Sequence, residues 1–376
     1  MSKTVFVLGA GASMDCGAPL MKDFVPRAED LLRKPDLEPE SKEAIRLVLK
    51  ARAELLSVYP KAHVDIHNVE SLFGIFEMAQ LLGSLGPLDA KHISTLREAM
   101  EILISTAIEK SIRYRVESSR YPTPPATYKR FAELLIAIWQ SNNNSWQHVS
   151  VLTFNYDVAL DYACHFKKIP IDYGLSRIKS GDDRLELLKL HGSLNWGRCS
   201  NTEKCQEIVP FTMNQLAWDY FLNLDYIPIE TSKLLCKLQH CETPIQSRPV
   251  IAPPTWNKGK YHLELETVWQ RAARHLSEAE NIFIIGYSLP PTDEFFRYFY
   301  ALGSIGPVVP RNVWVIDPEL EVARRFKKIL GGAALAPECF RPVNQTFEAT
   351  INSLMTLLVE RKQPKREAMK LHELGD

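Results

Sequence analysis

Four short runs of apolar, largely β-branched residues punctuate this chain, and stretches of helical periodicity follow them. Each run is nearly continuous in apolar residues, which is typical of parallel strands covered by helices on both faces. After the last run, apolar residues recur at helical spacing, as Leu320, Val322, Ala323 and Phe326 show. This alternation predicts an α/β fold with a Rossmann-like, doubly wound parallel sheet. The expected strands are Thr4–Leu8, Val149–Thr153, Asn281–Ile285 and Asn312–Ile316.

The gap between the first two strands is far longer than the roughly 30 residues of a simple crossover. Apolar residues recur at helical spacing within it, from Val69 to Phe76 and from Leu96 to Ile108. We therefore expect a single domain over residues 1–376 with a helical insertion at 36–120. Further along, we expect a second, small insertion at 199–246 and a charged tail at 360–376.

Composition excludes some classes of function. Lysine plus arginine and aspartate plus glutamate both number 45, so no global field attracts nucleic acid or a membrane surface, and no direct nucleic-acid site is evident. The uncharged stretch 134–156 is broken by the polar block Gln140–Ser145, so no membrane span is expected. Seven scattered cysteines indicate reduced thiols and a cytoplasmic protein.

A glycine-rich turn follows the first expected strand and precedes a helical segment. Gly9, Ala10, Gly11 and Ser13 lie where backbone amides can approach a nucleotide pyrophosphate, although a tight structural turn explains the same glycines. No Lys-Ser or Lys-Thr pair follows, which excludes a Walker A loop. Met14 occupies the third glycine position of the dehydrogenase fingerprint, which disfavours hydride transfer.

Polar residues also follow two buried runs further along the chain. Thr153, Asn155 and Asp157 stand where one strand ends, the place where open α/β sheets bind ligands. A turn and a helix N-cap would explain Asn155 and Asp157 equally well. His191 and Gly192 end the apolar run 187–190, and a lone histidine in that position is more often structural than catalytic.

Taken together, these loops resemble the sirtuin family. The segments are GAGAS at Gly9–Ser13, TFNYD at Thr153–Asp157, LHGS at Leu190–Ser193 and IGYSL at Ile285–Leu289. They occur in the family's order, and the resemblance covers about residues 4–23 and 149–318. It implies a Rossmann-type core and chemistry at the bond between nicotinamide and ribose of NAD.

The resemblance also implies roles for individual residues. Asn155 would contact the nicotinamide ribose and position a water, and His191 would be the general base toward a ribose hydroxyl. Asp157 would meet the nicotinamide amide, beside Thr153. The pyrophosphate would be bound by Gly9, Ala10, Gly11 and Ser13, and the adenosine side by Gly286 and Ser288. Asp317 would bind ribose hydroxyls, unless it only caps the loop before Pro318.

Two departures from protein-deacylating sirtuins point to water as the acceptor. The segment Gly17–Lys22 lacks the family's Asp-Phe-Arg, and Thr255–Lys258 replaces the Phe-Gly-Glu that pairs with a substrate strand. This variant pattern resembles sirtuin-like NAD hydrolases of bacterial anti-phage defence, which implies a homo-oligomer activated by a separate partner, with a hexameric DNA-translocase-type ATPase as first expectation. The alternatives are a protein deacylase or ADP-ribosyltransferase, and a non-catalytic sensor of NAD or ADP-ribose.

Four cysteines fall in the second insertion, where sirtuins carry a zinc ribbon. Cys199 and Cys205 form one half, and Cys236 and Cys241 the other. Both spacings are longer than the usual C-x2-C, and His240 adds a further ligand candidate. Structural zinc is therefore an open alternative that the spacing does not favour.

Overall fold

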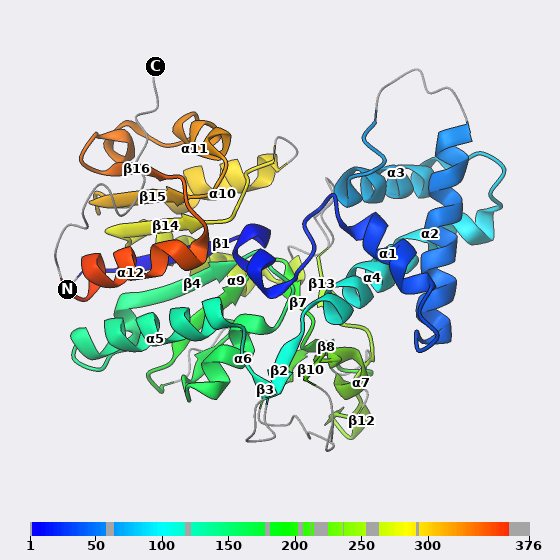
Figure 1. Ribbon diagram of the computed structural model, residues 1–376, viewed down its shortest axis with the longest axis horizontal. Helices are drawn as coiled ribbons and strands as arrows, with labels where there is room; N and C mark the ends of the chain where they lie inside the picture. The colour runs from blue at the N-terminus through cyan, green and yellow to red at the C-terminus, as the bar shows by residue number, and fades with distance from the viewer. Residues whose placement is uncertain are drawn as a thin grey trace.

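The computed structural model is an α/β protein built on one parallel sheet (Figure 1). It describes residues 2–57, 64–116, 122–176, 181–201, 205, 207–211, 213, 225–235, 237–252, 263–290 and 293–360. The predicted fold class is confirmed, including the helical and the smaller insertion. None of the helices in these ranges is long and apolar enough to cross a bilayer.

The central sheet has seven strands in the order β16-β15-β14-β1-β4-β6-β5, and every neighbouring pair runs parallel. All four strands predicted from the sequence are present with the predicted bounds. The chain first builds outward from β1 on one side and then returns to its other side, which makes the sheet doubly wound. The strands are β1 (Thr4–Leu8), β4 (Val149–Thr153), β5 (Ile171–Asp172), β6 (Leu185–Lys189), β14 (Asn281–Ile285), β15 (Asn312–Ile316) and β16 (Phe340–Val343).

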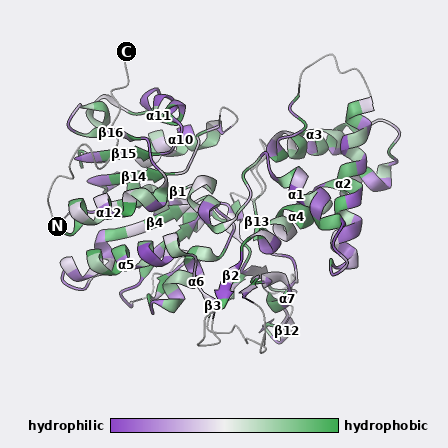
Figure 2. Ribbon diagram, in the orientation of Figure 1, coloured by the Kyte–Doolittle hydropathy of each residue, from purple (hydrophilic) through white to green (hydrophobic). Residues whose placement is uncertain are grey.

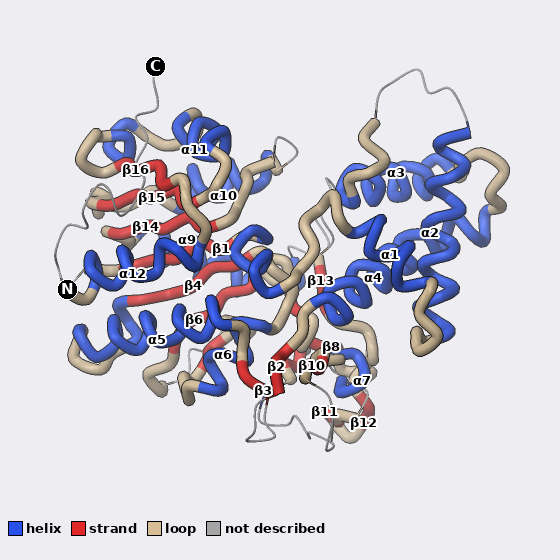
Figure 3. Tube along the Cα trace, viewed as in Figure 1, coloured by secondary structure: helices blue, strands red, loops and turns tan. Residues whose placement is uncertain are grey.

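Helices cover both faces of the sheet, as Figure 3 shows by secondary structure. Phe6 and Leu8 of β1 belong to one apolar core, whereas Val5 and Val7 belong to the other. Because alternate side chains point to opposite faces, a strand with two buried faces must be apolar throughout. The first core contains α5 (Ala126–Ser141), α6 (Ala159–Phe166) and α12 (Phe347–Leu358), and the second contains α9 (Glu266–Ser277), α10 (Glu294–Gly303) and α11 (Leu320–Lys327).

The helical insertion lies to one side of the sheet in Figure 1. It contains α2 (Pro39–Ser57), α3 (Val69–Leu82) and α4 (Ala90–Ser111), preceded by α1 (Phe24–Leu32), so helical structure begins before the predicted residue 36. Asn68 and Asp89 cap α3 and α4 by accepting backbone N–H groups. Hydrophilic and hydrophobic residues interleave along α2 in Figure 2, as expected for a helix with one buried face.

Short strands and one short helix make up the second insertion and its surroundings. They are β2 (Tyr114–Val116), β3 (Pro122–Thr123), β7 (Gly192–Ser193), β8 (Trp196–Arg198), β9 (Ile208–Pro210), β10 (Tyr226–Ile227), α7 (Thr231–Leu235), β11 (Gln239–His240), β12 (Thr243–Pro244) and β13 (Val250–Ile251). Pairing of β10 with β2 joins this insertion to the end of the helical one. Of the predicted tail, Glu360 is described and residues 361–376 lie outside the described residues.

Candidate functional site

The candidate residues follow strands that run in the same direction, so they meet at one edge of the sheet. Gly9 follows β1, Asn155 and His191 follow β4 and β6 on one side of it, and Gly286 and Asp317 follow β14 and β15 on the other. The edge above β1 is the point where the direction of sheet building reverses. In open α/β sheets this is the usual ligand position.

Backbone packing accounts for part of the glycine pattern at this edge. Gly11 N donates to Gly286 O at 2.8 Å, and Gly9 N donates to Ile285 O at 3.0 Å. A Cβ built on Gly9 would stand 2.4 Å from Tyr287 Cα, and one on Gly286, whose φ is +60°, would stand 2.3 Å from Ala12 N. These contacts require glycine whatever the ligand. The glycines thus form the tight structural turn that was the alternative to a nucleotide site. Ala10 and Gly11 of this turn are partly exposed.

The segment after the glycines is η1 (Ala10–Cys16), a 3-10 helix of seven residues and not an α-helix. Ser13 within it is fully buried and lies at the centre of a hydrogen-bond network. Its Oγ donates to Asp157 Oδ2 at 2.7 Å and accepts from Asn155 Nδ2 at 3.0 Å. Because its single proton is given to Asp157, the Tyr128 hydroxyl at 2.7 Å must be a donor to Ser13.

Asn155 is held against the first turn by both of its amide protons. Its Nδ2 donates to Gly9 O at 2.9 Å as well as to Ser13 Oγ. A carbonyl oxygen can only accept, so this contact fixes which end of the amide faces the turn. Below it, Thr153 Oγ1 donates to Leu8 O and accepts from Asn155 N, at 3.2 and 3.1 Å. These hydrogen bonds join the loop after β4 to the glycine turn after β1.

Asp157 is buried, and both of its carboxylate oxygens contact protein groups. Oδ2 accepts from Ser13, and Oδ1 accepts from Ala159 N at 3.0 Å at the start of α6. Burial raises the pKa of this carboxyl, against the lowering effects of the Lys189 ammonium and of these hydrogen bonds. Asp157 thus stands beneath the surface of the site, and its bond to Ala159 N matches the turn that the sequence left open, whereas the N-cap position of α6 is Val158.

His191 lies beside the residues that flank Asn155. Its ring centroid is 5.0 Å from that of Phe154, in an edge-to-face arrangement, and 6.1 Å from that of Tyr156. A Cβ on Gly192, whose φ is +82°, would stand 2.1 Å from Val250 O, so the His-Gly pair needs its glycine for the turn into β7. The histidine is buried within an aromatic cluster that also includes Trp269 at 6.4 Å.

The residues expected on the adenosine side differ in exposure. Ser288 is exposed in the loop after β14, while Asp317 is half-buried after β15. Asp317 Oδ1 accepts from Glu319 N at 2.8 Å, and burial raises the pKa of its carboxyl. This hydrogen bond matches the loop-cap alternative, and it leaves Oδ2 as the oxygen that could face a ligand.

Sequence reasoning missed several buried polar residues beneath the site. Tyr128 of α5 contacts Ser13, and Lys189, Asp161, Tyr173 and Asn195 form a second network below Asp157. Tyr128 carries no signal in the sequence, since it stands in an ordinary amphipathic helix. Lys189 did carry one, because a lysine within the apolar run Leu187–Leu190 would be buried in a central strand.

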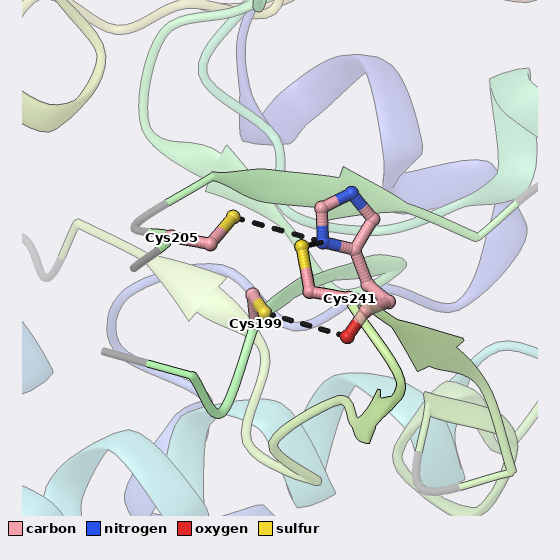
Figure 4. A group of neighbouring side chains, drawn as sticks. Cys199, Cys205 and Cys241 are labelled. Carbon is pink, nitrogen blue, oxygen red and sulfur yellow. Dashed lines mark hydrogen bonds between the residues drawn. The ribbon is translucent and has the colours of Figure 1, made fainter. Parts of the chain in front are cut away.

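The second insertion gathers a set of metal-ligand side chains (Figure 4). Donor atoms of Cys199, Cys205, His240 and Cys241 all lie within 4.8 Å of one another. His240 Nδ1 is 3.3 Å from Cys241 Sγ and 3.7 Å from Cys205 Sγ, while hydrogen bonding to the His240 side chain lowers the pKa of Cys199 to about 6. Three thiols and one imidazole fit tetrahedral zinc. The fourth predicted cysteine, Cys236, lies outside the described residues.

Comparisons with known proteins give structural relatives at low identity. No protein-family model matches the chain, and no curated protein does. Among solved structures, the chain is similar to ADP-ribose complexes of two Sir2 homologue variants, one serine-to-alanine and one phenylalanine-to-alanine, at 13% and 14% identity. Each alignment covers 95% of this chain and 92% of the Sir2 homologue, with a TM-score of 0.37. It is also similar to a Sir2 variant with a p53 peptide and NAD, at 12% identity, 94% and 92% coverage and a TM-score of 0.33. Similarity at this level assigns no activity to the chain, which resembles Sir2 proteins in structure without being placed among them.

Proposed function

We propose that this chain is an NAD-binding enzyme that hydrolyses the bond between nicotinamide and ribose, giving nicotinamide and ADP-ribose. The observation that carries the proposal is the double hydrogen bond from Asn155 Nδ2 to Gly9 O and Ser13 Oγ. It joins the loop after β4 to the turn after β1 at the switch point of the sheet. The sirtuin resemblance of the loops supports NAD as the dinucleotide.

The orientation of Asn155 suits it to a ribose hydroxyl or a water. Both protons of its amide nitrogen face the first turn, so the oxygen Oδ1 is the atom that can accept a hydrogen bond from a ligand. Asn155 is partly exposed, unlike its neighbours Phe154 and Tyr156. We assign it the positioning of the nucleophilic water next to the ribose carbon.

His191 is the proposed general base, because imidazole is the side chain best suited to exchanging a proton near neutral pH. In the proposed step, the bond from the ribose carbon to the nicotinamide nitrogen breaks, and its electron pair neutralises the pyridinium charge. The water oxygen bonds to the same carbon, and its proton passes to solvent. His191 assists by accepting the proton of a ribose hydroxyl as positive charge develops on the sugar.

The remaining site residues would bind or support the dinucleotide. Ala10 and Gly11 are partly exposed in the turn and would face the pyrophosphate, with Gly9 and Ser13 shaping the turn from within. Ser288 and Asp317 would meet the adenosine half, where Gly286 keeps the loop close to the turn. Thr153 and Asp157, whose hydrogen-bonding groups contact protein atoms, would hold Asn155 in place from beneath.

Zinc at Cys199, Cys205, His240 and Cys241 would be structural, because four protein ligands leave no open position for chemistry. The ion would supply a cross-link between the connection from β8 to β9, which carries Cys199 and Cys205, and the β11–β12 hairpin. It would thereby fix the second insertion beside the site.

We further propose that the chain acts in a homo-oligomer as an NAD-depleting effector of anti-phage defence, switched on by a separate ATPase subunit. The support is the resemblance of the loops to that group and the departures at Gly17–Lys22. Co-purification of the chain with the product of a neighbouring ATPase gene, followed by an NAD assay of the complex with and without phage DNA, tests this assignment. An isolated monomer with full activity would contradict it.

The activity itself is tested by incubating the purified chain, alone and with such a partner, with NAD. We expect release of nicotinamide and ADP-ribose in equal amounts, measured by liquid chromatography. Nicotinamide release that needs an acylated peptide would indicate a deacylase or transferase instead. Tight NAD binding without turnover under activating conditions would indicate a sensor.

A further inference from the structure

Lys189 is a buried cation directly beneath the candidate site. It is the last residue of β6, and its side chain is 1% exposed. The ammonium donates to Asp161 Oδ2 at 3.0 Å and to the backbone oxygen of Asp157 at 2.6 Å. Lysine is almost never fully buried unless it is paired, so the structure around it must supply these partners.

The partners of Lys189 lead to the loop that carries His191. Asp161 Oδ1 accepts from the Tyr173 hydroxyl at 2.7 Å, and that hydroxyl accepts from Asn195 Nδ2 at 3.1 Å. Asn195 Oδ1 in turn accepts from Ser193 Oγ at 2.6 Å, two residues after His191. Every member of this chain is buried or part-buried, so each hydrogen bond fixes the position of the next group.

On its other side, Lys189 acts on the loop that carries Asn155. Its hydrogen bond to the Asp157 backbone oxygen holds that loop directly. Its positive charge lowers the pKa of the Asp157 carboxyl, which burial raises. An ionised Asp157 accepts the proton of Ser13, which leaves the Ser13 oxygen free to accept from Asn155. The direction of these bonds therefore depends on the charge state of Asp157.

We infer that Lys189 is a positioning residue, whose buried ammonium ties the Asn155 loop to the His191 loop and favours the carboxylate form of Asp157, the form that accepts from Ser13. The effect of Lys189 on catalysis rests on the proposed function, whereas its electrostatic effect on Asp157 does not. Among the described residues, titratable groups from five elements act electrostatically on Asp157, and Lys189 is the cation of this set. These groups are Lys189 of β6, Asp161 of α6, Cys16 of η1, Tyr114 of β2 and Tyr128 of α5.

The electrostatic role is tested by stability against pH. Asp157 has a folded pKa raised above its unfolded value, so its contribution to stability is fully present below the unfolded pKa and is lost as pH rises through the folded one. Lys189→Met removes the opposing charge and leaves Asp161 without its cation. We expect its deficit in free energy of unfolding, measured by urea titration, to widen as pH rises from about 4 to about 8.

Lys189→Arg keeps the charge and is the matched control, with a deficit that does not change with pH. A deficit of Lys189→Met that is equally constant would mean that the loss comes from hydrogen bonding and packing and not from the charge of the lysine, which would overturn the inference. If Lys189→Met does not fold at neutral pH, folding that is recovered on acidification supports the inference, and failure to recover contradicts it.

The positioning role is tested by the pH profile of nicotinamide release. The charge of Asp161 raises the pKa of Asp157. Asp161→Asn, which keeps the shape of the side chain, should therefore move the acid limb of the pH–rate profile to lower pH. Lys189→Met should move it to higher pH, and Lys189→Arg should leave it in place. Protonation of the proposed base His191 also produces an acid limb, so the rate on the plateau of the profile is compared as well, and Lys189→Met should lower it while Lys189→Arg should not. A plateau rate of Lys189→Met equal to that of wild type, together with an acid limb unmoved in Asp161→Asn and Lys189→Met, would overturn the positioning role. A wild-type chain that releases no nicotinamide would instead remove the proposed function, and the stability measurement would still decide the role of Lys189.

Discussion

Asn155 Nδ2 donates a hydrogen bond to Gly9 O at 2.9 Å, across 146 positions of sequence. This contact joins the ends of β4 and β1, the two central strands on which the proposed site is built. The second proton of the same amide reaches Ser13, so the loop and the turn are fixed to each other at two points. Hydrogen bonds within the protein therefore fix the Asn155 loop against the glycine turn.

The network around Ser13 makes a first prediction. Tyr128→Phe removes the hydroxyl that donates to Ser13 Oγ, within a fully buried environment. We expect a loss of about 1 kcal/mol in the free energy of unfolding and a lower rate of NAD hydrolysis, since Ser13 also holds Asn155. Tyr298→Phe, at a side chain that is 65% exposed, is the control and should change neither quantity. Equal behaviour of the two variants would refute the role of the network.

The close packing of the two glycine loops makes a second prediction. Gly286→Ala forces a Cβ to within 2.3 Å of Ala12 N at a φ of +60°. We expect destabilisation by roughly 2 kcal/mol or more in a urea titration, with loss of NAD binding. At Gly331 an added Cβ meets nothing within 4 Å, so Gly331→Ala should stay within about 0.5 kcal/mol of wild type. A tolerated Gly286→Ala would show that the two loops are not packed as described.

The cysteine cluster makes a third prediction. We expect about one zinc per purified chain by elemental analysis, and thiolate-to-metal absorption after replacement by cobalt. Cys205→Ser and His240→Ala should each reduce metal retention, because both contribute to the cluster. Cys339→Ser, at a buried cysteine outside the cluster, should retain the metal. If Cys236→Ser loses zinc while His240→Ala keeps it, the ligand set inferred from the geometry is wrong.

The sequence predicted the sheet well because its strands are buried on both faces. Continuous apolar runs such as Asn281–Ile285 mark them without ambiguity, and their bounds agree with the structure. The short strands β5 and β16 went unpredicted, since runs of two and four residues are too short to show a clear periodicity. The helical insertion was expected from its apolar spacing, and α1 precedes its helices along the chain.

Asn155 and His191 could be singled out from the sequence as candidates, because each follows a buried strand. The buried polar groups beneath them could not, because their importance comes from pairing across the fold. Tyr128 and Asp161 stand in helices whose patterns are ordinary, and no local spacing relates them to Ser13 or Lys189. Likewise, the spacing of the cysteines disfavoured zinc, whereas the fold of β11 and β12 brings His240 into the cluster.

The central claim is that Asn155 and His191 serve one reaction on NAD. The most direct measurement is the rate of nicotinamide release under activating conditions from wild type, Asn155→Ala and His191→Ala, with melting temperatures recorded for each. We predict a fall of about 100-fold or more in both variants with the fold retained, because each removes a group placed at the reacting ribose. Full turnover in both variants, or a wild type that leaves NAD intact with every activator supplied, would contradict the account.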